Sequence, residues 1–102
     1  MSVAKFTRTV SIVNPEGLHA RFAILIAELA RRYDACITLC KDVERVQATD
    51  VLQILSLCAE QGERLRLEAT GRQAAEALDA LVQLITNYSQ EGQNSPAAPE
   101  SE

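Results

Sequence analysis

The chain has 102 residues, 47% of them hydrophobic, which suits one globular domain and leaves too little for two separate cores. Its formal net charge is −4, with no basic residue after Arg72 and no Trp, so we expect neither the basic face nor the aromatic platform of a nucleic-acid-binding protein. No apolar run approaches the roughly 20 residues that a membrane span requires, so membrane insertion is not expected.

The first third of the chain predicts a strand, a turn and a helix. Residues 5–13 alternate between apolar and polar positions, as a half-buried strand does. Residues 14–17, Asn-Pro-Glu-Gly, predict a turn, because Pro fixes φ and Gly permits a positive φ. From residue 20 to residue 32 apolar residues recur at helical spacing, and Arg31 and Arg32 complement the helix dipole in the last turn. The apolar positions of this helix are Ala23, Ile26, Ala27 and Ala30.

The middle of the chain predicts two more strands and a second helix. Residues 34–40 alternate again, and residues 43–48 form a brief strand after a short polar link. Asp50 then begins a helix that runs to about Ala59. Gln53, three residues after this N-cap, gives an arrangement similar to a capping box.

The last third predicts a strand over residues 63–69, a helix over residues 73–87 and a tail. The apolar stripe of this helix consists of Ala74, Ala77, Leu78, Leu81, Val82 and Ile85. From Tyr88 onward the composition turns to Gln, Glu, Gly, Asn, Ser, Pro and Ala, which offers too little apolar surface to offset ordering entropy. We therefore expect a domain over residues 1–87 and a disordered acidic tail over residues 88–102.

The predicted order is βαββαβα, which belongs to the α+β class. At least three strands carry one polar face, so the helices should cover the same side of the sheet and leave the other side to solvent. This arrangement is an open-faced sandwich. The pattern alone does not distinguish it from a ferredoxin-like βαββαβ domain with an added helix.

The only histidine, His19, lies between the turn and the first helix, close to the N-cap position. Backbone N–H groups at residues 21 and 22 lack intrahelical partners there, and the positive end of the helix dipole favours an anion. A phosphoryl group on this imidazole would find donors in place, and the guanidinium of Arg21 could contact its oxygens. The alternative for an isolated histidine is an ordinary surface turn residue.

Residues 14–21, Asn-Pro-Glu-Gly-Leu-His-Ala-Arg, resemble the active-site motif of HPr, the histidine-containing phosphocarrier of the bacterial phosphoenolpyruvate-dependent phosphotransferase system. The resemblance extends through residues 47–57, Gly62 and residues 68–71, and covers about residues 4–87. It implies an antiparallel four-stranded sheet covered on one face by three helices.

The resemblance also implies a function. His19 would accept a phosphoryl group on Nδ1 from phospho-Enzyme I and pass it to a downstream acceptor domain. The sequence leaves open whether the acceptor serves sugar transport, a nitrogen-related branch or a purely regulatory one. Arg21 and the backbone at Ala20 and Phe22 would bind the phosphate. Such a protein is a carrier and not a stand-alone enzyme. The alternative is a regulatory module that keeps the binding surface without transferring phosphate.

One position near the histidine departs from the family motif. Phe22 stands where the motif normally has Pro. Pro suits a first helical turn because its φ is preset, whereas Phe supplies an additional N–H toward the anion site. Phe also places a large ring beside the histidine, so we expect Phe22 to alter docking to a partner.

A second departure is Asp50, where many family members carry a serine that a regulatory kinase phosphorylates. Asp caps a helix as well as Ser but cannot be modified in this way. Beside it we expect an exposed apolar patch that docks a partner, with Ile54 and Leu57 facing the core. The patch consists of Val51, Leu52 and Leu55.

The cysteines give no sign of a disulfide or a metal site. Cys36 and Cys40 are four residues apart on one strand, roughly 13 Å along it, whereas a disulfide needs Cα atoms within about 7 Å. Cys58, near the end of the second helix, is expected to be a small buried residue. The odd cysteine count and the absence of a signal-peptide core after Met1 favour a cytoplasmic protein. We expect a monomer with no metal and no cofactor.

Overall fold

The structure is a computed structural model that describes residues 4–94, with side chains described as far as Tyr88. Its elements follow the predicted order βαββαβα. They are β1 (Lys5–Ser11), α1 (Ala20–Ala30), β2 (Cys36–Lys41), β3 (Glu44–Gln47), α2 (Val51–Ser56), β4 (Arg64–Thr70) and α3 (Ala74–Asn94).

The four strands form one antiparallel sheet in the order β1-β4-β2-β3. Thr7 pairs with Glu68 and Glu68 with Thr38, which fixes the register across the three longer strands. A ferredoxin-like sheet is also antiparallel, but its strands follow the order β4-β1-β3-β2. The order β1-β4-β2-β3 therefore excludes the ferredoxin-like alternative. The α+β open-faced sandwich is confirmed.

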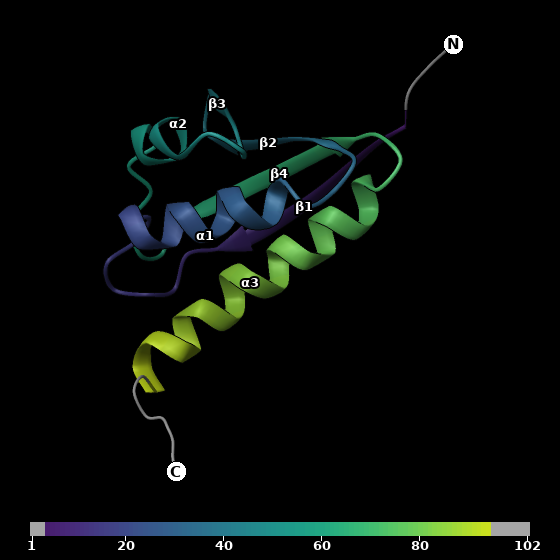
Figure 1. Cartoon of the computed structure of the whole chain (residues 1–102). Helices are drawn as coiled ribbons and strands as arrows, with labels where there is room; N and C mark the ends of the chain where they lie inside the picture. The colour runs from purple at the N-terminus through teal and green to yellow at the C-terminus, as the bar shows by residue number, and fades with distance from the viewer. Residues whose placement is uncertain (1–3, 95–102) are drawn as a thin grey trace.

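The helices lie on one face of this sheet. Figure 1 shows α1 and α3 side by side in front of the strands, with α2 beside β3. The residues predicted to face inward from α1 are all buried, and so are those of α3 except Val82, which is partly buried. The buried strand residues include Val10, Ile12, Ile37, Leu39, Leu65 and Leu67.

Two helices end earlier than the sequence predicts. Helix α1 stops at Ala30, and Arg31 is its C-cap, with its guanidinium donating to the carbonyl oxygen of Thr49 at 2.7 Å. Helix α2 stops at Ser56, because Cys58 takes a left-handed φ of 51°. The prediction that Cys58 is buried was wrong, since its side chain is exposed.

Helix α3 is longer than predicted. It continues past residue 87 to Asn94, so residues 88–94 are helical and the expected tail does not begin at Tyr88. In this added stretch, Tyr88 packs against the buried core, which anchors the helix beyond the predicted end. The rest of the predicted tail, residues 95–102, lies outside the described residues.

The open face of the sheet is polar but not uniformly solvated. Glu68 is only 6% exposed and accepts hydrogen bonds from Arg45 at 2.8 Å and Arg66 at 2.9 Å. Lys5 adds an ion pair at 3.6 Å. The hydrogen bond from Arg45, aided by Arg66 and Lys5, lowers the pKa of Glu68 to about 2 although burial opposes the shift. Within residues 4–94, no helix is both long enough and apolar enough to cross a membrane.

Candidate functional site

The turn before α1 is stabilised by hydrogen bonds from the Asn14 side chain and to the loop that contains Ala59. The buried Asn14 donates from Nδ2 to the carbonyl oxygen of Gly17 at 3.0 Å, and the Gly17 N–H donates back to the Asn14 carbonyl oxygen at 3.0 Å. The N–H of Leu18 donates to the carbonyl oxygen of Ala59 at 2.9 Å. Gly17 has φ +66°, and a Cβ added there would lie 2.5 Å from the Ala59 oxygen. The turn therefore requires glycine at this position.

His19 is the N-cap of α1, as the sequence predicts. Its backbone is extended, with φ −107° and ψ 178°, and its carbonyl oxygen accepts the N–H of Ala23 at 2.9 Å. The imidazole makes no capping hydrogen bond. Within the described chain, the N–H groups of Ala20, Arg21 and Phe22 also have no hydrogen-bond partner. The first turn of α1 thus presents free donors at the positive end of the helix.

The imidazole of His19 is partly exposed and contacts one other side chain by a hydrogen bond. Its Nε2 lies 3.2 Å from the hydroxyl oxygen of Tyr88, and the two ring centroids are 5.8 Å apart. Among the side chains that the structure describes, as far as Tyr88, Nδ1 has no partner. One ring nitrogen is therefore bound to a neighbour and the other is open to a reactant.

Phe22 lies beside the histidine but beneath the surface. Its ring is 6.3 Å from the His19 ring and stacks on Tyr88 at 4.3 Å with an interplanar angle of 10°. Its side chain is 0% exposed, so Phe22 cannot itself contact a docking partner, and that part of the prediction was wrong. The apolar ring is buried between α1 and α3, where it supports Tyr88.

Arg21 is exposed, and its guanidinium has no hydrogen bond or ion pair to any described residue. It lies two residues after His19, in the first turn of α1. A guanidinium that is not committed to a carboxylate is available to an incoming phosphate. The structure therefore places Arg21 and the free N–H donors in the same turn as the histidine.

Asp50 is the N-cap of α2. Its Oδ1 accepts the N–H of Gln53 at 3.1 Å. The reciprocal bond of a capping box is absent here, because Gln53 Oε1 accepts the N–H of Gln47 at 2.9 Å instead of the Asp50 N–H. Asp50 thus has a structural role that accounts for its position.

The predicted apolar patch is only partly exposed. Leu52 is 77% exposed, whereas Val51 and Leu55 are half-buried against the core. Ile54 and Leu57 are buried, as predicted. The sequence analysis missed Ile24 on the neighbouring α1, which is 43% exposed. The sequence indicated this exposure, because Ile24 is apolar but lies outside the predicted apolar stripe of the helix.

Sequence reasoning also missed Tyr88, which was assigned to the tail. The signal was present, since Leu81, Ile85 and Tyr88 follow one another at spacings of four and three, the period of one helix face. Tyr88 brings the third helix to the histidine, a contact that the motif around residue 19 does not reveal.

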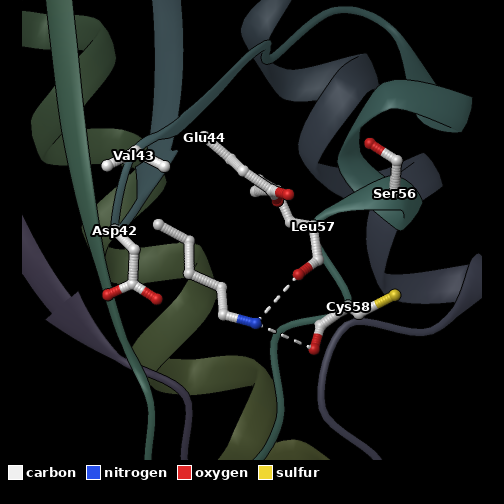
Figure 2. A pocket seen from close by; sticks show the side chains of 7 residues that line it. Asp42, Val43, Glu44, Ser56, Leu57 and Cys58 are labelled. Carbon is white, nitrogen blue, oxygen red and sulfur yellow. Dashed lines mark hydrogen bonds between the residues drawn. The ribbon is translucent and has the colours of Figure 1, made fainter.

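The largest described pocket lies elsewhere. It has a volume of about 330 Å³ and is formed by the β2–β3 turn and the end of α2 (Figure 2). Lys41 donates there to the carbonyl oxygens of Leu57 at 3.0 Å and Cys58 at 3.3 Å, and pairs with Glu63 at 3.2 Å. None of the predicted site residues lines this pocket. Among the described residues, no cluster of His, Cys, Asp or Glu is arranged to hold a metal ion.

Comparisons with known proteins agree with this geometry. The family model described as "PTS HPr component phosphorylation site" matches residues 6–87. The chain is 36% identical over 84 residues to the phosphocarrier protein HPr of Treponema pallidum, covering 82% of this chain and 96% of that protein. It is 39% identical over 83 residues to the phosphocarrier protein NPr of Shewanella violacea, covering 81% of this chain and 91% of that one.

Solved structures give the same result. The crystal structure of HPr-C-His from Thermoanaerobacter tengcongensis superposes with a TM-score of 0.80 at 37% identity, covering 84% of this chain and 97% of that one. HPr from Bacillus anthracis superposes with a TM-score of 0.76 at 33% identity, covering 79% of this chain and 96% of that one. The sheet, the three covering helices and the family match lead to one conclusion: the chain belongs to the HPr family of phosphocarrier proteins of the phosphotransferase system.

Proposed function

We propose that this protein is a cytoplasmic phosphocarrier in which His19 accepts a phosphoryl group on Nδ1 from phospho-Enzyme I and passes it to a downstream acceptor domain. The observation that carries the proposal is the position of His19 at the N-cap of α1, where neither its Nδ1 nor the adjacent N–H groups have a partner among the described groups. His19 is partly exposed and lies outside the described pockets, which suits a reaction between two proteins.

The surrounding groups each have a role in this reaction. The N–H groups of Ala20, Arg21 and Phe22 bind the phosphoryl oxygens, and the helix dipole favours their negative charge. The guanidinium of Arg21 adds a charge-assisted hydrogen bond to the phosphoryl group. Among the described residues, no carboxylate pairs with this guanidinium, so it is available to the phosphate. These donors stabilise the charge of the transferring group.

Docking is assigned to exposed apolar side chains on α1 and α2. Leu52 on α2 and Ile24 on α1 are exposed on helices that contact each other. Exposed apolar side chains on adjacent elements are a common basis for protein contacts. Val51 and Leu55 complete the patch from its half-buried base.

The test is incubation with phosphoenolpyruvate and the cognate Enzyme I, with the product weighed as the intact protein. We expect a gain of one acid-labile phosphate in the wild type and none in His19→Ala, which removes the only histidine. A folded wild-type protein that gains no phosphate, with an Enzyme I that is active on another carrier, would overturn the proposal in favour of a non-transferring regulatory module.

A further inference from the structure

We infer that Tyr88 is a positioning residue for phosphoryl transfer, holding His19 through Nε2 so that the lone pair of Nδ1 faces the reactant. This inference deepens the proposed function and rests on it. The evidence is the 3.2 Å contact between the Tyr88 hydroxyl oxygen and His19 Nε2, together with the stacking of Tyr88 on Phe22. Tyr88 lies inside α3, which runs on to Asn94, so the hydroxyl is held by a continuous helix.

The chemistry requires a particular proton position. A neutral imidazole carries one proton, and the nitrogen that attacks phosphorus must be the one without it. If Nδ1 is the nucleophile, Nε2 carries the proton. A tyrosine hydroxyl both donates and accepts, so the 3.2 Å contact fits either tautomer of His19. In the tautomer that attacks through Nδ1, Tyr88 accepts the Nε2–H, and the inference is that this hydrogen bond holds the ring in that form.

The same contact becomes stronger as transfer proceeds. The Nδ1 lone pair forms the bond to phosphorus while the bond from phosphorus to the donor breaks, and that electron pair stays with the donor. Because Nε2 keeps its proton, the imidazole of His19 gains a positive charge. A hydrogen bond from a charged donor is stronger than a neutral one, so the Tyr88 hydroxyl stabilises the phosphorylated ring more than the free ring and accelerates the transfer.

Phe22 holds the Tyr88 side chain in place. The ring is fully buried and lies parallel to Tyr88, which restricts the tyrosine to one orientation. The residue that departs from the family motif therefore acts on His19 through Tyr88. The rigidity that Pro would give to the helix start is replaced by a stacked pair of aromatic rings joining α1 to α3.

The test compares Tyr88→Phe with Tyr33→Phe. The first variant removes the hydroxyl but keeps the ring that stacks on Phe22. The second makes the same chemical change at the other tyrosine, which packs against the core away from the hydrogen bond to His19. Two readouts are needed: the ¹⁵N NMR shifts of the neutral imidazole, and the kcat and KM with which Enzyme I phosphorylates each protein.

We expect a protonated Nε2 in the wild type and in Tyr33→Phe, and a larger share of the Nδ1–H tautomer in Tyr88→Phe. We expect kcat to fall on the order of tenfold in Tyr88→Phe at nearly constant KM, which is the loss of one hydrogen bond to a charged group. Unchanged tautomers and rates in Tyr88→Phe would overturn the inference. A wild type that is never phosphorylated would overturn the proposed function instead, and the NMR comparison would still test the hydrogen bond.

Discussion

Replacing Gly17 with Ala tests whether the backbone turn, and not the motif alone, positions the histidine. Gly17 has φ +66°, and a Cβ there would lie 2.5 Å from the carbonyl oxygen of Ala59 and 3.0 Å from the Cα of Glu60. Both neighbours are backbone atoms, so neither can rotate out of the way. The chain offers a matched control in Gly62, which has φ +92° and nothing within 4 Å of an added Cβ.

Both substitutions place a side chain at a positive φ, and only the one at Gly17 also puts the new Cβ against backbone atoms. A residue with a side chain in the left-handed region costs about 1–2 kcal/mol, and this cost applies to both. Overpacking against fixed atoms adds about 1–3 kcal/mol, and this cost applies to Gly17 alone. The reduced entropy of the unfolded chain is the same for both variants and cancels. We therefore expect Gly17→Ala to lose about 1–3 kcal/mol more than Gly62→Ala.

Urea unfolding measures this difference, at slopes of about 1 kcal/mol per molar urea or somewhat more for a domain of this size. We expect the midpoint of Gly17→Ala to fall below that of Gly62→Ala by about 1 M or more. We also expect Gly17→Ala to be phosphorylated more slowly, because the turn and the first turn of α1 move together. Equal midpoints and equal phosphorylation rates for the two variants would refute the reasoning.

Three further predictions follow from single residues. Asp50→Ala should lower the free energy of unfolding by about 1 kcal/mol, and Asp50→Ser should restore it, since both Asp and Ser cap a helix; equal losses would contradict this. Because the folded pKa of Glu68 is lowered to about 2 from an ordinary 4.5, the stability it contributes is fully present above pH 4.5 and is lost as the pH falls to about 2. The difference in urea midpoint between wild type and Glu68→Gln should therefore be large at pH 6 and shrink toward pH 2, and a constant difference would argue against the shift. Leu52→Asp should leave the melting temperature within a few degrees of wild type and weaken Enzyme I binding by calorimetry, whereas unchanged affinity would exclude Leu52 from the docking surface.

Local patterns predicted the order of the elements and their buried faces. Alternation over residues 63–69 placed Leu65 and Leu67 in the core, and helical spacing placed Ala23 and Ile26 there, because strand and helix periods alone decide which side chains share a face. His19 at the N-cap was equally predictable, since a turn must end where the helix begins.

What the sequence did not reveal depends on contacts between distant segments. Glu68 on β4 is paired with Arg45 on β3, although strand β2 lies between these two strands in the sheet. Tyr88 was assigned to a polar tail because its neighbours in the sequence are polar. Its stacking partner Phe22 lies 66 positions earlier in the chain, so local composition does not reveal the contact. The early end of α2 at Ser56 goes with the left-handed backbone of Cys58, a conformation that a cysteine does not predict.

The position of the phosphorus atom on the imidazole tests the account most directly. The protein is phosphorylated with phosphoenolpyruvate and Enzyme I, and the coupling of phosphorus to each ring nitrogen of ¹⁵N-labelled His19 is measured by NMR. The account predicts one phosphoryl group bonded to Nδ1, because Nε2 lies 3.2 Å from the Tyr88 hydroxyl. A phosphoryl group on Nε2, or none on His19 at all, would contradict it.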